Sequence, residues 1–275
     1  MTRTGPSLVG RPGTAYVLPM LSSMTPPMDD HALASTLATS AGELLLRTRS
    51  ANAGLEPKAL KDLGDRVSHE FLMAEIGQAR PDDAVLSEEG ADDQARLSAD
   101  RVWIIDPLDG TREFSEVGRD DWAVHVALWG KGQLIVGAVA RPAKGITYST
   151  SQSDGPKGVA GTPLRLAVSR SRPPEFVTRL AEHLGAQLVP MGSAGVKAMS
   201  VLDGEADAYV HAGGQYEWDS AAPVVVASGN GLHASRIDGS ALIYNNANPY
   251  LPDLVVCRAE VAEAVLAGIR AVSEA

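Results

Sequence analysis

Two aspartates three residues apart follow an apolar run in residues 102–114, VWIIDPLDGTREF. The apolar residues predict a buried strand, and Asp106 and Asp109 come where that strand leaves its sheet. Pro107 fixes its own φ and favours an extended Asp106, so the turn is stiff and can aim both carboxylates at one point. Such close carboxylates raise each other's pKa unless a cation lies between them, and hard oxygen ligands select Mg²⁺, Mn²⁺ or Ca²⁺ over Zn²⁺.

Two further acidic segments could join this site. LSEEG places Glu88 and Glu89 at the end of a short apolar run, and QYEWDSAAP places Glu217 and Asp219 at the start of a predicted helix. Each segment alone has an ordinary explanation: a turn for DPLDG, a solvated turn for the glutamates, and a helix cap for Asp219. All three close a strand or open a helix, and this coincidence favours one shared site.

Composition limits the classes of protein to consider. A chain of 275 residues predicts one large domain or two halves. Its net charge of −10 argues against sequence-independent nucleic-acid binding, although bound cations would still admit small phosphorylated ligands. The single cysteine, Cys257, fits a reducing cytoplasm, and no apolar run approaches the roughly 20 residues of a membrane span.

The first half of the chain predicts an antiparallel-rich sheet packed on a helix pair. Residues 1–27 lack a helical or alternating period and are interpreted as a disordered leader, or as a start assigned too early. Apolar patterns predict helices over 30–50 and 65–80 and strands over 84–87, 101–105, 121–129, 133–140 and 146–150. An apolar stripe through Leu33, Leu37 and Leu44 marks the first helix, and Gly130-Lys131-Gly132 predicts a hairpin.

The second half alternates strands and helices. Strands are predicted over 164–168, 186–190, 207–211, 232–235 and 254–257, and helices over 174–184, 194–204, 219–229 and 259–274. Such alternation predicts a parallel or mixed sheet with helices on its faces. We therefore expect an α+β half over 28–160 that carries most of the carboxylates, and an α/β half over 161–275 that completes the site.

LSEE, WIIDPLDGTREF and EWDSAAP, in this order, resemble three signatures of the inositol monophosphatase superfamily, which comprises Mg²⁺-dependent, lithium-sensitive phosphatases. The resemblance covers about residues 30–270 and implies an α/β (α+β) class with a layered αβαβα sugar-phosphatase-like fold. Leu108 in the turn and Arg-Glu-Phe after Thr111 resemble the CysQ branch, the 3′(2′),5′-bisphosphate nucleotidases; inositol monophosphatases usually continue with Thr-Asn-Phe. VSRSR (168–172) and GSAGVKAM (192–199) also resemble CysQ segments.

The resemblance implies a set of metal ligands. Glu88, Asp106 and the Leu108 carbonyl would hold one Mg²⁺. Asp106, Asp109 and Asp219 would hold a second, and Glu88 would reach a weaker third ion. The expected cofactor is therefore two or three Mg²⁺ ions.

The resemblance also assigns the phosphate and the attacking water. The backbone N–H groups of Gly110 and Thr111 would receive the phosphate, and the Thr111 hydroxyl would pair with Asp65 to orient the water. The chain departs from the family pattern here, with Asp-Leu-Gly-Asp in place of Val-Thr-x-Ala-Asp. Pro223, where the family often has Gly, is expected in the first turn of its helix, where proline is tolerated.

Basic residues in the CysQ-like segments are candidates for a second substrate phosphate. Arg170, Arg172 and Lys197 are predicted at turns of the second half, and Lys197 is expected to contact a phosphate or ribose at a helix start. The histidines show no zinc-binding spacing, and His125, in an alternating strand, is predicted to be packed in the core.

The resemblance implies hydrolysis of 3′-phosphoadenosine 5′-phosphate (PAP) to AMP, or of its sulfated form PAPS to APS, in cytoplasmic sulfur assimilation. A homodimer is common in the family. The alternatives are an inositol monophosphatase or a fructose-1,6-bisphosphatase of the same superfamily, and a non-catalytic phosphate-ligand sensor. Loss of a metal carboxylate would favour the sensor, and the sequence retains all of them.

Overall fold

A computed structural model describes residues 28–152 and 154–273, so the leader predicted over 1–27 lies outside the described residues. The described helices are α1 (Asp30–Ala51), α2 (Pro57–Ala79), α3 (Thr111–Ser115), α4 (Glu175–Leu184), α5 (Ala194–Leu202), α6 (Glu217–Gly229) and α7 (Ala262–Ser273). The strands are β1 (Ala84–Ser87), β2 (Arg101–Asp109), β3 (Ala123–Gly130), β4 (Gln133–Arg141), β5 (Ile146–Ser149), β6 (Arg165–Ser169), β7 (Gln187–Met191), β8 (Ala208–Tyr216), β9 (Leu232–Ser235) and β10 (Tyr250–Arg258). None of the helices in this part of the chain is long and apolar enough to cross a membrane.

The strands form two five-stranded sheets. The first has the order β1-β2-β3-β4-β5; β1 and β2 are parallel and the other pairs antiparallel, so the sheet is antiparallel-rich as predicted. Lys131 and Gly132, both with positive φ, close the predicted β3–β4 hairpin. The second sheet has the order β7-β6-β8-β10-β9 and is mixed, because β6 runs parallel to β7 and β8 while β10 is antiparallel to β8 and β9.

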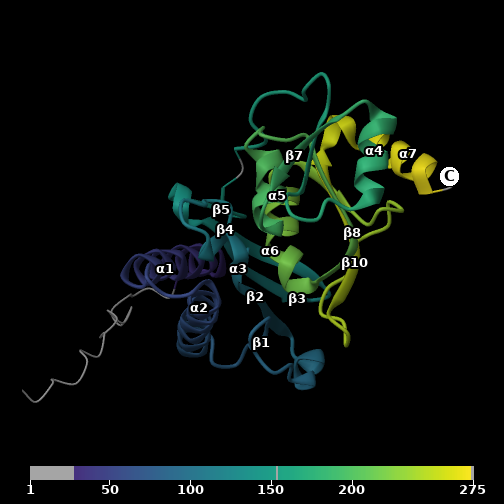
Figure 1. Cartoon of the computed structure of the whole chain (residues 1–275). Coiled ribbons are helices and arrows are strands. Elements are labelled where there is room, and N and C mark those ends of the chain that lie inside the picture. The colour runs from purple at the N-terminus through teal and green to yellow at the C-terminus, as the bar shows by residue number, and fades with distance from the viewer. Residues whose placement is uncertain (1–27, 153, 274–275) are drawn as a thin grey trace, which may run out of the picture.

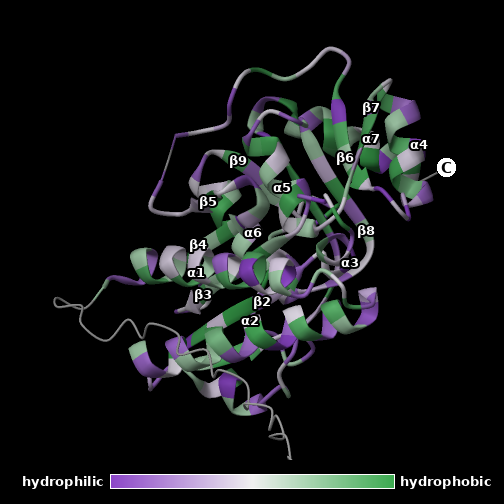
Figure 2. Cartoon of the chain, turned by 60° about the vertical axis from the view of Figure 1, so that its left-hand side comes forward, coloured by the Kyte–Doolittle hydropathy of each residue, from purple (hydrophilic) through white to green (hydrophobic). Residues whose placement is uncertain are grey.

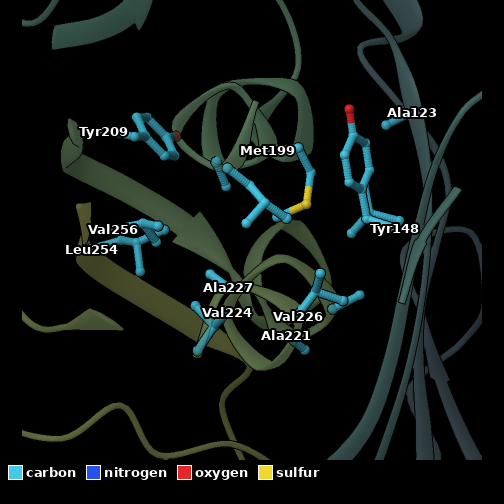
Figure 3. Close-up of a cluster of buried hydrophobic side chains, with 14 of the residues drawn as sticks. Ala123, Tyr148, Met199, Tyr209, Ala221, Val224, Val226, Ala227, Leu254 and Val256 are labelled. Carbon is cyan, nitrogen blue, oxygen red and sulfur yellow. The ribbon is translucent and has the colours of Figure 1, made fainter. Parts of the chain in front are cut away.

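Three buried clusters stack these sheets and helices into five layers (Figure 1). Helices α1 and α2 cover the outer face of the first sheet through residues such as Leu37 and Trp103. Helices α5 and α6 fill the space between the sheets, where Met199 and Val226 lie (Figure 3). Helices α4 and α7 cover the outer face of the second sheet. The result is the expected αβαβα arrangement, and its central cluster joins both halves of the chain.

The hydropathy of each layer follows from its burial. In Figure 2, β2 is largely hydrophobic, whereas α1 and α2 mix hydrophobic and hydrophilic residues.

Asp29 caps α1 by accepting from the Ala32 amide at 2.8 Å. The buried stripe of α1 ends on Leu45, not on the predicted Leu44, which is only half-buried.

Several predicted boundaries were wrong. Helix α2 begins at Pro57 rather than at 65. The apolar pattern missed its first turns because the buried i, i+4 row includes a glycine and a serine: Leu60, Gly64, Ser68, Leu72 and Ile76. Strand β2 was expected to end at 105 but continues through Asp109, with a bulge between Asp106 and Asp109. Strands β8 and β10 are also longer than predicted, and the last helix begins at Ala262 after a short 3₁₀ turn. Bulges of this kind re-aim side chains near functional sites.

Close packing of α6 on the first sheet depends on Gly137 in β4. A Cβ at this position would lie 2.3 Å from Val225 Cγ1 and 3.1 Å from the Ala222 carbonyl. We expect Gly137→Ala to lower the free energy of unfolding by about 1–3 kcal/mol through overpacking, as measured by urea denaturation. Gly77→Ala is the control, because that position in α2 has open space around it and should be neutral or slightly stabilised. Equal effects of the two changes would contradict this account of the interface.

Candidate metal centre

Four carboxylates converge where β1, β2 and α6 meet. Strand β1 is parallel to β2 with Ser87 opposite Ile105, so Glu88 follows β1 beside Asp106. The Glu88 and Asp106 carboxyl groups lie close enough for the charge of Glu88 to raise the pKa of Asp106. Asp219 comes from the first turn of α6, and its charge acts on both Glu88 and Asp106. The structure thus brings together the sequence segments that were expected to share one site.

Burial and mutual repulsion raise the pKa values of most of this cluster. Burial, then the charge of Asp219, raises the pKa of Glu88 to about 7. Burial, then the charge of Asp109, raises the pKa of Asp219 to about 6. The pKa of Asp106 rises well above its ordinary value for the same two reasons. A cluster in this state gains stability by taking up protons or cations.

Asp109 differs from its neighbours because the protein compensates its charge. Its carboxylate accepts hydrogen bonds from the Ser193 hydroxyl and from the amides of Ala194, at 3.1 Å, and Gly195, at 2.7 Å. Burial alone would raise the pKa of Asp109, but the charge of His125 and these polar contacts outweigh it and hold the pKa well below its usual range. Asp109 is therefore ionised and fixed in place.

His125 is the site residue that sequence reasoning missed. It is fully buried on β3, as predicted for a packed residue, but it lies inside the cluster. Its Nε2 is 3.1 Å from Asp109 Oδ2, and its Nδ1 is 3.1 Å from the Trp218 carbonyl, to which Nδ1 must donate because a carbonyl only accepts. Burial alone would lower the pKa of His125, but the charge of Asp109 raises it. The pairing of β3 with β2 places His125 opposite Asp106, so a prediction of this strand register would have placed His125 in the site.

Ligand atoms of Asp106, Asp109 and His125 lie within 4.8 Å of one another, close enough to surround one ion. Because Nδ1 is occupied by the Trp218 carbonyl and Nε2 faces a carboxylate, the imidazole compensates charge. The oxygen atoms of the cluster remain as the donors that a hard cation prefers.

Helix α6 begins earlier than predicted, and this changes the position of its acidic residues. Tyr216 is the N-cap, and Asp219 is the third helical residue, whose carboxylate accepts from the Tyr216 amide at 2.7 Å. Pro223 consequently lies inside the helix, not in its first turn, and cannot donate to the Asp219 carbonyl. Glu217 is fully buried and binds the amides of Asn245 and Asn246 instead of joining the cluster.

Thr111 and Asp65 meet beside the carboxylates. The Thr111 hydroxyl is 3.4 Å from Asp65 Oδ1 and 3.1 Å from the Leu108 carbonyl. Gly64 makes this approach possible, because a Cβ there would lie 2.7 Å from the Phe114 ring. Burial raises the pKa of Asp65 to about 7, with a further contribution from the charge of Glu89. The altered sequence before Asp65 thus still delivers a carboxyl group to Thr111, although its role in the reaction stays a prediction.

Gly110 begins α3 with a left-handed φ of +85°. A Cβ at this position would lie 3.1 Å from the Ser193 Cβ and 3.2 Å from Trp122. Glycine therefore allows the start of α3 to approach the turn that precedes α5.

Lys197 lies inside the protein rather than at an open helix start. Its ammonium donates to the carbonyls of Gly192, at 3.2 Å, and Ser193, at 2.5 Å, and lies 5.3 Å from the centre of the Tyr209 ring. Ser193 has a φ of +47°, and Asp121 accepts from the Gly192 amide at 2.6 Å. Lys197 and Asp121 therefore hold the strained turn that binds Asp109, and the expected contact with a phosphate or ribose is replaced here by backbone carbonyls.

Arg170 lies at the border between β6 and α3. Its guanidinium donates to Glu113 Oε1 at 2.6 Å and to Glu116 Oε2 at 3.4 Å. Its side chain is 28% exposed, so part of it faces solvent. Arg172 is exposed on the same connection. Of these basic residues, Arg170 is the one held near α3.

A layered αβαβα fold with acidic residues at the ends of β1 and β2 and at the start of α6 defines a class of phosphatase folds. The chain belongs to the inositol monophosphatase family, whose model matches residues 29–273. A protein of Mycobacterium leprae named 3′-phosphoadenosine 5′-phosphate phosphatase is 51% identical over 89% of this chain and 95% of its own. The Mycobacterium tuberculosis protein of the same name is 55% identical over 83% of this chain and 89% of its own. The crystal structure of CysQ from Bacteroides thetaiotaomicron superposes with a TM-score of 0.72 at 26% identity, covering 82% and 96% of the two chains.

Removal of the buried ammonium tests the account of the Ser193 turn. We expect Lys197→Met, which keeps the length of the side chain, to lower the free energy of unfolding by about 2–3 kcal/mol, because two buried carbonyls lose the ammonium that donates to them. Lys58→Met is the control: that lysine is exposed and pairs with the exposed Asp62, so its loss should cost under about 1 kcal/mol. Urea denaturation of both variants measures the difference, and a Lys197 variant as stable as the control would contradict the assignment.

Proposed function

We propose that this protein is a Mg²⁺-dependent phosphomonoesterase that hydrolyses PAP to AMP and phosphate, and PAPS to APS. The complete carboxylate cluster of Glu88, Asp106, Asp109 and Asp219 is the observation that carries the proposal. The names of the 51–55% identical relatives support PAP as the substrate. The proposed reaction belongs to sulfur assimilation in the cytoplasm.

The donor set fits hard divalent cations. The raised pKa values of Glu88, Asp106 and Asp219 express a repulsion that Mg²⁺ would relieve. These carboxylates, with Asp109 and the Leu108 carbonyl, would hold two or three ions. When bound, Mg²⁺ neutralises the phosphate, lowers the pKa of water and stabilises the leaving oxygen.

Residues of the chain itself would orient the reactants. The amides of Gly110 and Thr111 would bind the phosphate at the start of α3. Asp65, whose pKa of about 7 suits a base at neutral pH, would accept a proton from the attacking water while Thr111 fixes its position. Arg170 is the proposed contact for the second phosphate, and Lys197 would act on the substrate through the turn that it supports. The protein is proposed to be a homodimer, which sedimentation would test.

Phosphate release from three substrates tests the proposed function. With Mg²⁺ present, kcat/KM for PAP should exceed that for inositol 1-phosphate and for fructose 1,6-bisphosphate by about 10²-fold or more. The second phosphate distinguishes PAP from inositol 1-phosphate, and the base distinguishes it from both. Chelation of Mg²⁺ should abolish release, and Li⁺ should inhibit it. A wild-type preference for either sugar phosphate would replace the nucleotidase proposal with the corresponding alternative of the same superfamily. Binding of PAP without any phosphate release would favour a sensor.

Asp106→Asn separates metal binding from folding. Asparagine keeps an acceptor for the Leu108 amide and removes one charge from the repelling cluster. We expect kcat to fall at least about 10³-fold, roughly 4 kcal/mol of transition-state stabilisation, while the melting temperature in EDTA stays equal to wild type or rises. The increase in melting temperature on adding Mg²⁺ should shrink. Asp100→Asn, at the exposed residue before β2, should change none of these quantities. A fully active Asp106 variant would refute the metal assignment.

A further inference from the structure

Three aromatic side chains form a stacked group at the surface beside the metal centre. The Tyr216 and Trp218 rings are nearly parallel, 7° apart in plane, with centroids separated by 4.8 Å. Tyr250 contacts Tyr216 edge-on at 6.0 Å. Tyr216 is 45% exposed and Tyr250 is 48% exposed. Two half-exposed tyrosines, held by ordered contacts with neighbouring rings, form a surface suited to a planar ligand.

Backbone atoms of Tyr216 and Trp218 form hydrogen bonds with residues of the metal centre. The Tyr216 amide donates to Asp219 at 2.7 Å, and His125, which faces Asp109, donates to the Trp218 carbonyl at 3.1 Å. Tyr216 and Trp218, which carry the stacked rings, therefore lie within one helical turn of Asp219, a proposed metal ligand.

Glycines fix the direction of Tyr216. Strand β8 bulges at Gly213 and Gly214, between the pairs Ala212–Asp253 and Gln215–Leu251. Gly214 has a φ of +90°, and a Cβ there would lie 2.4 Å from the Tyr250 hydroxyl. Tyr250 thus packs directly over the backbone of the bulge. Such a bulge bends the end of a strand and re-aims its last side chain, here Tyr216.

Trp218 covers one face of the Tyr216 ring, and 45% of Tyr216 remains exposed to solvent. Aromatic side chains of this kind stack nucleobases without reading their hydrogen-bonding edges. In a nucleoside 3′-phosphate one ribose separates the phosphorus from the base, which fits aromatic residues that lie within one helical turn of Asp219. Resting on the proposed function, we propose that Tyr216 is the stacking platform for the base of the bound nucleotide, supported from behind by Trp218 and at its edge by Tyr250.

Kinetics on PAP and on a base-free analogue test this role. The analogue, 1,4-anhydroribitol 3,5-bisphosphate, keeps the sugar and both phosphates but lacks the base. Tyr216→Ala should raise KM for PAP about tenfold or more with kcat within about twofold, and should leave kcat/KM for the analogue within about twofold of wild type. The bond to Asp219 survives this substitution because it uses the backbone amide. Tyr216→Phe, which keeps the ring, should retain the wild-type KM for PAP.

Product binding gives an independent measurement. Calorimetry in Mg²⁺ should show Tyr216→Ala weakening AMP while ribose 5-phosphate binds as it does to wild type. Equal losses for PAP and the base-free analogue, or no loss for either, would overturn the proposed stacking role of Tyr216. The role would also be overturned if the only effect of Tyr216→Ala were to dissociate a dimer. If wild type itself fails to prefer PAP over inositol 1-phosphate, the proposed function fails instead, so the two failures are distinguishable.

Discussion

Electrostatic repulsion among four carboxylates is the constraint to which the rest of this structure responds. Glu88, Asp106, Asp109 and Asp219 come from three elements and are brought into one partly buried site, where each acts on the pKa of others. Burial increases the cost, because a low-dielectric environment penalises every ionised group. Such a cluster lowers the free energy of unfolding when no cation is bound. Binding of Mg²⁺ to the folded protein would raise the free energy of unfolding again.

The surrounding layers hold the cluster open for cations instead of neutralising it. Only Asp109 is paired closely, by His125 from the first sheet and by the turn before α5 that Lys197 supports. His125 and Lys197 help to lower the pKa of Asp109, whereas Glu88, Asp106 and Asp219 keep raised pKa values. The layered fold makes this geometry possible, because β1 and β2 end where α5 and α6, from the second half, begin. Both halves of the chain are therefore needed to complete the centre.

Much of the fold and of the cluster could be predicted, because short-range patterns encode both. The D-x-x-D turn, the acidic end of β1 and the start of α6 were visible as motifs, and strand alternation gave the two sheets. The contacts of His125 and Lys197 could not be predicted. His125 faces Asp109, which is 16 residues away in sequence, and Lys197 binds backbone carbonyls of a turn in which Ser193 has a positive φ. Glu217 and Asp219 were equivalent candidates in the sequence. Because α6 begins at Glu217, the Glu217 carboxylate binds the amides of Asn245 and Asn246, whereas Asp219 faces the metal centre.

The central claim is that divalent cations complete this carboxylate cluster. Anomalous diffraction from crystals soaked in Mn²⁺, a stand-in for Mg²⁺ with the same preference for oxygen ligands, tests it most directly. The account predicts at least one strong peak within bonding distance of Asp106 and Asp109, with Glu88 and Asp219 completing the ligands of this or a second peak. A cluster without a peak, at Mn²⁺ concentrations that support phosphate release, would contradict it.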